Sequence, residues 1–123
     1  MRFFLSVMGD ENYEAGKLPP AKAMEEMAVF LDRAMAASVI TSAAGLLPTS
    51  TGARLRARNG EIAILDGPFS EAKEVIGGYA FIEATSREEA IRIAREFIET
   101  HFRGGIMDVD VELRQVGGGP KID

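Results

Sequence analysis

One carboxylate in this chain stands where a β-sheet could present it to a ligand. Asp66 ends a run of residues typical of a strand and is followed at once by Gly67, Pro68 and Phe69. Partial burial in a cleft would raise the pKa of such a carboxylate towards the range of a general base. The same side chain could instead cap the backbone amide of Phe69 or Ser70 in an Asx turn. The two interpretations are compatible.

Gly67, Pro68 and Phe69 are interpreted as structural residues of a tight loop. Gly67 is expected to have a positive φ, which glycine adopts without strain, and Pro68 fixes its own φ. The loop continues with further polar residues, which are Ser70, Glu71, Lys73 and Glu74. Lys73 and Glu74 are expected to be solvated or to latch the loop.

Further candidates for a ligand site are Tyr79, Glu112 and Arg114. Glu112 and Arg114 share one face of a predicted strand, where the arginine could bind a ligand carboxylate through two hydrogen bonds. Arg114 could equally pair with a glutamate at a dimer interface. Tyr79 is interpreted as a core or interface aromatic residue rather than a proton donor. His101, the only histidine, is expected to face free carbonyls at a helix end rather than act as a general base.

The composition limits the classes of function. At 123 residues, with 46% hydrophobic and 27% charged residues, the chain is expected to form one soluble domain with a proper core. A net charge of −5 gives no basic surface for nucleic acid or an anionic membrane. The absence of cysteine excludes disulfides, thiolate metal sites and cysteine nucleophiles. No apolar run is as long as a membrane span, and the early acidic residues argue against a signal peptide, so we expect a cytoplasmic protein. We also expect no cofactor and no bound metal.

Apolar spacing in the first half of the chain indicates alternating strands and helices. Residues 2–8 are apolar on both faces and predict a central strand, and residues 9–18 predict a loop. Pro19-Pro20 then opens an amphipathic helix that ends near residue 38. A methionine stripe on this helix could be a promiscuous binding surface, but its spacing favours core packing. Residues 39–41 predict a second strand.

The second half predicts a hairpin followed by strand, helix and strand. Asn59-Gly60 predicts a type I′ turn between residues 53–58 and 61–65, with Arg54, Arg56 and Arg58 on one face. These arginines could bind phosphate, but a solvated hairpin face is the favoured interpretation. Residues 76–84 predict a strand. A helix capped by Thr85 or Ser86, with Ser86 and Glu89 as a capping box, follows and frays at 101–105. Residues 109–116 predict the last strand.

This order of elements predicts an α+β fold of the ferredoxin-like split βαβ type with an inserted β-hairpin, in a single domain over residues 1–116. Residues 117–123 are expected to form a flexible, glycine-rich tail. Two helices can cover only one face of such a sheet. The other face would expose Tyr79, Phe81 and one of Phe3 and Phe4, so we expect a homodimer that packs these faces together.

Several stretches resemble the DGPF group of the YCII-related family. They are DGPF at residues 66–69, SEAKE at 70–74, IGGYAFIEA at 76–84 and the closing VELRQV at 111–116. The resemblance implies a dimeric α+β barrel, in which two sheets face each other across a cleft. It implies no established activity, although some relatives lie beside extracytoplasmic sigma factors, which suggests regulation. More distant relatives are proposed to use a His–Asp pair, but their histidine position falls at residues 20–23, which here read PAKA.

Two functions remain as hypotheses. The first is a small-molecule-binding or regulatory homodimer with a cleft near the DGPF loop that takes a small polar or anionic ligand. The alternative is a cofactor-free isomerase or lyase of the dimeric-barrel type that uses Asp66 as general base. The chain lacks an obvious second acid or base and a metal-binding motif, which favours the first hypothesis. Neither hypothesis involves nucleic acid or a membrane.

Overall fold

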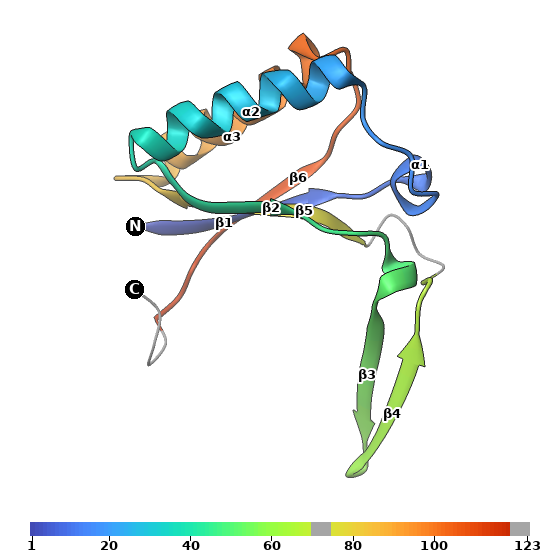
Figure 1. Ribbon diagram of the computed structural model, residues 1–123. Coiled ribbons are helices and arrows are strands. Elements are labelled where there is room, and N and C mark those ends of the chain that lie inside the picture. Colours follow the sequence, from blue (N-terminus) through green and yellow to red (C-terminus); the bar gives the residue numbers. More distant parts are fainter. Residues whose placement is uncertain (70–74, 119–123) are drawn as a thin grey trace.

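The computed structural model describes residues 1–69 and 75–118, and it is built around a four-stranded antiparallel sheet. The strand order is β2-β5-β1-β6, with β1 at Arg2–Met8, β2 at Ile40–Gly45, β5 at Ile76–Glu83 and β6 at Val111–Gln115. The helices α2 (Ala21–Ala36) and α3 (Arg87–Arg103) lie side by side on one face of this sheet (Figure 1). The α+β, ferredoxin-like prediction is confirmed.

The core lies between this sheet and the two helices. Alternate residues of β1 and β5 point towards the helices, and Leu5 and Ile82 are among the most completely buried side chains. Phe30 of α2 meets Phe97 of α3 edge to face, with ring centroids 6.2 Å apart. The strand at residues 2–8 is central as predicted, because it pairs with β5 on one side and β6 on the other.

The face of the sheet opposite the helices carries an aromatic cluster. Phe4 stacks on Tyr79 with ring centroids 6.0 Å apart, and it meets Phe81 at 5.3 Å. Phe3 instead points into the core, where it is buried. The sequence therefore predicted this face correctly, and the structure selects Phe4 as its third aromatic residue.

The predicted hairpin is present as a separate two-stranded sheet. β3 (Ala53–Arg58) pairs with β4 (Glu61–Asp66), and positive φ values of 52° at Asn59 and 79° at Gly60 confirm the predicted turn. We call residues 53–66 the arm. In Figure 1 the arm leaves one end of the four-stranded sheet and extends to the side opposite the helices.

Three local predictions were wrong. Residues 9–18 are not wholly a loop, because Glu11–Glu14 form a short helix, α1, whose first turn is capped by Asp10. The connection before the arm contains a 3₁₀ turn at Thr49–Thr51. The helix α3 does not fray at His101 but continues to Arg103 and is capped by Gly104. The second strand also extends to Gly45, because β5 pairs with it along that length.

The cap of α3 agrees with the sequence only in part. Ser86 accepts a hydrogen bond from the Glu89 amide at 3.1 Å, as a capping box requires. The Glu89 carboxylate accepts instead from the Thr85 hydroxyl at 2.8 Å. Both residues that the sequence offered as caps therefore contribute to the start of this helix.

Some predictions fall on residues outside the described ranges. These are Ser70, Glu71, Lys73 and Glu74 of the loop and residues 119–123 of the tail. Within residues 1–69 and 75–118, no helix is long and apolar enough to cross a membrane.

Candidate functional site

Three of the predicted site residues lie together on the helix-free face of the sheet. Tyr79 on β5 and Glu112 on β6 both sit opposite Ser6 of β1, while Arg114 sits opposite Phe4 in the next row. Because β1 lies between β5 and β6, Tyr79 and Glu112 are on strands separated by roughly 10 Å. The prediction that Glu112 and Arg114 share one strand face is consistent with this register, and the role of all three residues in binding stays a prediction.

Asp66 lies apart from those residues. It ends β4 opposite Ala53, on the arm rather than on the four-stranded sheet, and its side chain is exposed. The Phe69 amide, which Asp66 was expected to cap, donates instead to the Thr49 hydroxyl at 3.0 Å. That part of the Asx-turn prediction is therefore wrong, and the alternative cap at Ser70 lies outside the described residues. A catalytic role for Asp66 stays a prediction.

Gly67 is needed for a different reason from the one the sequence suggested. Its φ is not positive, so the predicted left-handed conformation is wrong. A Cβ atom at this position would lie only 1.7 Å from the Thr49 carbonyl oxygen. The Gly67 amide also donates to the Gly52 carbonyl at 2.9 Å, and the peptide bond to Pro68 is cis. Close backbone packing against the 3₁₀ turn therefore requires glycine here.

The DGPF loop is tied to α1 through Thr49. The Thr49 amide donates to one carboxylate oxygen of Glu14 at 3.0 Å, and the Thr49 hydroxyl donates to the other. That hydroxyl also accepts from the Phe69 amide, while the Phe69 ring lies 4.1 Å from the Arg54 guanidinium carbon. The motif thus acts as a joint between the arm, the 3₁₀ turn and α1.

Tyr13 connects α1 to the end of the sheet. Its hydroxyl lies 2.9 Å from the Leu46 carbonyl and 2.6 Å from the Leu47 carbonyl, to which it donates. Burial, with a smaller contribution from the Glu14 carboxylate, raises the pKa of Tyr13 above its usual value of 10.0. The Tyr13 ring also packs so closely on Gly9 that a Cβ there would lie 2.6 Å from it. Tyr13 is therefore a neutral phenol that donates a hydrogen bond through its hydroxyl, and its ring leaves no room for a side chain at Gly9.

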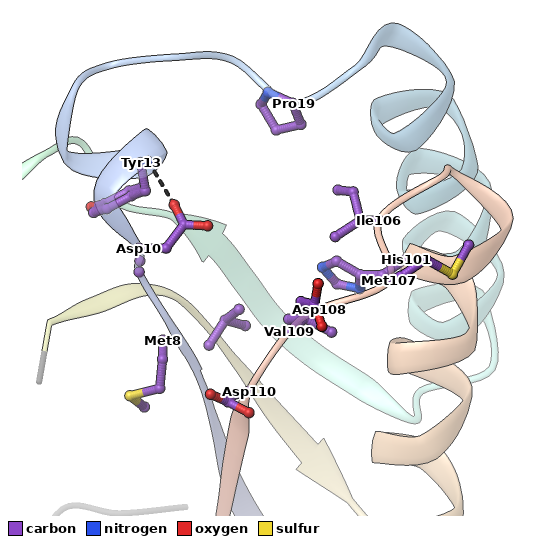
Figure 2. A pocket seen from close by; sticks show the side chains of 13 residues that line it. Met8, Asp10, Tyr13, Pro19, His101, Ile106, Met107, Asp108, Val109 and Asp110 are labelled. Atoms are coloured by element: carbon purple, nitrogen blue, oxygen red, sulfur yellow. Dashed lines mark hydrogen bonds between the residues drawn. The ribbon is translucent and has the colours of Figure 1, made fainter. Parts of the chain in front are cut away.

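A cavity of about 500 Å³ opens beside Tyr13, at the end of the sheet where β1 ends and β5 begins. Figure 2 shows Asp10 and Tyr13 on one side of it, and His101 with Ile106 and Asp108 on the other. Asp110 lines the same cavity, and Asp66 is not among its lining residues. Its volume falls in the range of small-molecule sites.

His101 is held in a defined orientation at this cavity. Its Nδ1 atom lies 2.9 Å from the Phe97 carbonyl oxygen, one turn earlier in α3. Because a carbonyl only accepts, Nδ1 carries the proton of this hydrogen bond, which leaves Nε2 for a ligand. His101 contacts a carbonyl as predicted, but this carbonyl lies within α3 and is not a free carbonyl at the helix end. No sequence pattern indicated that the same ring lines a cavity.

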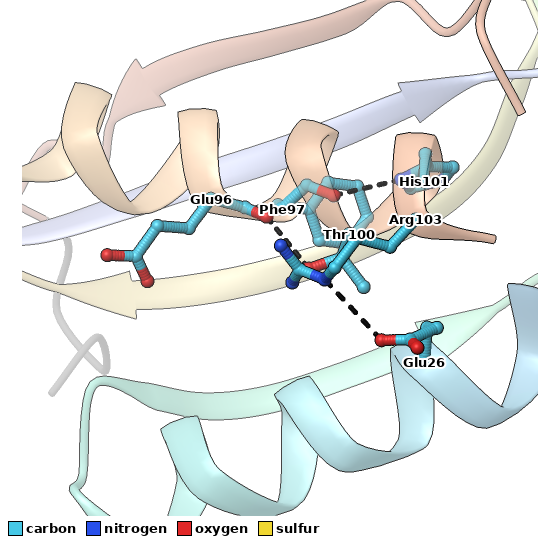
Figure 3. A network of polar contacts seen from close by, with 6 residues as sticks. All are labelled: Glu26, Glu96, Phe97, Thr100, His101 and Arg103. Atoms are coloured by element: carbon cyan, nitrogen blue, oxygen red, sulfur yellow. Dashed lines mark hydrogen bonds and ion pairs between the residues drawn. The ribbon is translucent and has the colours of Figure 1, made fainter. Parts of the chain in front are cut away.

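The last turn of α3 is braced against α2, which fixes the place of His101 (Figure 3). The Thr100 hydroxyl is buried, donates to the Glu96 carbonyl at 2.8 Å and accepts from Arg103 at 2.9 Å. Arg103 also forms an ion pair with Glu26 of α2 at 3.4 Å. These contacts explain why the helix does not fray where the sequence suggested.

The carboxylates of the cavity were not found by sequence reasoning. Asp10 is the cap of α1, and Asp108 and Asp110 come from the segment between α3 and β6. The usable signal was their place in the topology, because β1 ends at the same end of the sheet where β6 begins. Within residues 1–69 and 75–118, no group of three or more His, Asp or Glu residues is arranged to hold a metal ion.

A second, more apolar cavity of about 270 Å³ adjoins the first. The two cavities share Val7, Pro19, Gly77 and His101. Met27 and Leu31 of α2 line the second cavity, so part of the methionine stripe borders it as well as the core. His101 therefore stands between a polar compartment and an apolar one.

Comparison with known proteins identifies a family that this chain matches. The family model described as YCII-related domain matches residues 1–112. The chain belongs to the YCII-related family. An uncharacterized protein of Rhizobium meliloti (strain 1021) is 31% identical over 88 residues, which cover 72% of this chain and 71% of that protein. The family resemblance seen in the sequence is thus confirmed for this YCII-related chain.

Proposed function

We propose that this YCII-related protein is a homodimer that binds a small polar molecule in the cavity beside His101. The observation that supports this proposal is the oriented imidazole in a cavity of about 500 Å³. A histidine whose Nδ1 is already hydrogen-bonded offers Nε2 as a fixed acceptor. Pockets of this size with a few convergent polar groups are the usual form of small-molecule sites.

The residues around the cavity define the chemical class of the ligand. Asp10, Asp108 and Asp110 contribute acceptor oxygens and negative charge. A ligand that brings hydrogen-bond donors or a positive charge fits this lining better than the anionic ligand considered from the sequence. The adjoining apolar cavity, bordered by Met27 and Leu31, suits an aliphatic or aromatic part of the same molecule.

The homodimer rests on a separate observation, the aromatic cluster of Phe4, Tyr79 and Phe81 on the helix-free face. A second sheet packed on this face would bury the cluster in the way that the family resemblance implies. None of these three aromatic residues lines the cavity of about 500 Å³, although Tyr79 borders the smaller apolar cavity, so binding at the larger cavity and dimerisation can be tested separately.

A thermal-shift screen of small amines, amides and polar heterocycles tests the binding site. We expect compounds that raise the melting temperature of the wild type to lose most of that effect in His101→Gln and Asp108→Asn. Glu99→Gln is the matched control, because Glu99 is exposed on α3 but lines neither of the two cavities. Hits that stabilise His101→Gln and Asp108→Asn as strongly as the wild type would refute the site, and so would the absence of any hit.

A further inference from the structure

The arm is an apolar surface that no helix or strand among residues 1–69 and 75–118 covers. Residues that sit directly opposite each other in a hairpin share one face, so Leu55 with Ile64 and Ala57 with Ile62 form a continuous aliphatic face. Leu55, Ile62 and Ile64 are 68%, 72% and 68% exposed. The opposite face carries Arg54, Arg56 and Arg58 and is the polar one.

An isolated two-stranded ribbon of this kind is marginally stable in water. A long, exposed apolar ribbon is also a site of unwanted association, which natural proteins normally cover. The arm nevertheless has a regular register from Ala53 opposite Asp66 to Arg58 opposite Glu61. The aliphatic face of the arm therefore needs another surface that packs on it.

The direction of the arm points to what covers it. It leaves the sheet on the side opposite α2 and α3 (Figure 1), which is the side that carries Phe4, Tyr79 and Phe81. A second copy of the chain seated on that aromatic face therefore lies beside the arm. One occupant on that side of the sheet can therefore contact both the aromatic face and the arm.

The length of the arm gives the depth of the contact. A strand of six residues extends about 20 Å, whereas two sheets packed face to face are about 10 Å apart. The arm is thus long enough to pass the partner's sheet and reach its helix layer. In a two-fold symmetric dimer both arms make the same contact, which doubles the buried surface.

We propose that the arm is a clasp whose aliphatic face, formed by Leu55, Ala57, Ile62 and Ile64, docks on a second copy of this chain. This inference rests on the proposed homodimer and extends its interface beyond the aromatic face. The proposal also assigns a role to the contacts of the DGPF loop, because Gly67 and Thr49 fix the angle at which the arm leaves the domain.

Photo-crosslinking from the arm tip tests the clasp. The chain has no cysteine, so Glu61→Cys provides a single thiol for a benzophenone label beside the turn. Irradiation should give a product of two-chain mass in which the label is attached to the partner outside residues 53–66. Ile62→Lys in the labelled chain should abolish this product and raise the dimer dissociation constant at least tenfold.

The neighbouring residue on the other face provides the control. Ala63→Lys adds the same charge to the arginine side of the arm and should change the dissociation constant less than threefold. If light scattering shows a dimer but the labels attach only within one chain or from arm to arm, the clasp is overturned and the homodimer stands. A protein that stays monomeric at high micromolar concentration overturns both. The ligand screen is independent of either outcome.

Discussion

At the scale of single residues, the Thr49 carbonyl oxygen leaves no room for a Cβ atom at position 67, so glycine is required there. The positive φ that was expected at Gly67 is absent. A sequence can indicate that a glycine matters in a turn, yet the neighbour that restricts it is 18 residues away and comes from the fold.

Gly67→Ala should therefore destabilise the protein strongly. We expect the free energy of unfolding to fall by about 2 kcal/mol or more, because a backbone oxygen 1.7 Å away must be displaced. Urea denaturation measures this loss. Gly117→Ala is the matched control, since no atom lies within 4 Å of its Cβ position, and it should change stability by no more than about 0.5 kcal/mol. Equal stability of the two variants would contradict the steric explanation.

Tyr13 provides a prediction about pH. Its raised pKa means that folding favours the neutral phenol, so its contribution is fully present below pH 10 and is lost as the pH rises through the folded-state pKa. Tyr13→Phe should be less stable than the wild type by about 1 kcal/mol at pH 7, because it lacks the donor to Leu46 and Leu47. The difference should shrink above pH 10. A difference that grows in alkali would contradict this assignment.

At the scale of elements, hydrophobic periodicity predicted the long helices and strands, and side-chain contacts between distant segments decided the rest. α1 has four residues and no apolar repeat, so only the Asp10 cap indicates it locally. The final turn of α3 is held by Thr100, Arg103 and the distant Glu26, which no local pattern indicates. The hairpin was predictable because Asn59-Gly60 is a local signal.

Thr49→Val tests the joint between α1 and the DGPF loop. Valine keeps the shape of the side chain but removes the hydroxyl that Glu14 and Phe69 share, so the free energy of unfolding should fall by about 1–3 kcal/mol. Thr41→Val, at an exposed strand position, should be nearly neutral. Chemical denaturation of both variants makes the comparison. A neutral Thr49→Val would show that the joint does not depend on this hydroxyl.

At the scale of the whole molecule, the sequence predicted the covered and uncovered faces of the sheet but not the cavity. Tyr79 and Phe81 alternate with core residues, and this pattern was sufficient to predict the aromatic face. The cavity combines Asp10, His101 and Asp108, which the chain brings together only because α1, α3 and the start of β6 meet at one end of the sheet. No local sequence motif marks a cavity that forms where three distant segments meet.

Light scattering tests the assembly. We expect about 27 kDa for the wild type, twice the 13.3 kDa of one chain, and an interface above about 1,000 Å². Phe81→Lys, in the aromatic face, should shift the protein to the monomer. Arg95→Glu, on the exposed side of α3, should leave the dimer intact. A wild type of one-chain mass at micromolar concentration would contradict the proposed homodimer.

The central claim is that a ligand binds at His101, and the imidazole ¹⁵N spectrum of the protein tests it most directly. His101 is the only histidine, so the spectrum contains one ring. Without ligand we expect the neutral ring to carry its proton on Nδ1, hydrogen-bonded to Phe97. A compound that stabilises the protein should shift the Nε2 resonance while Nδ1 stays protonated. A stabilising compound that leaves both ring nitrogens unchanged would contradict the claim.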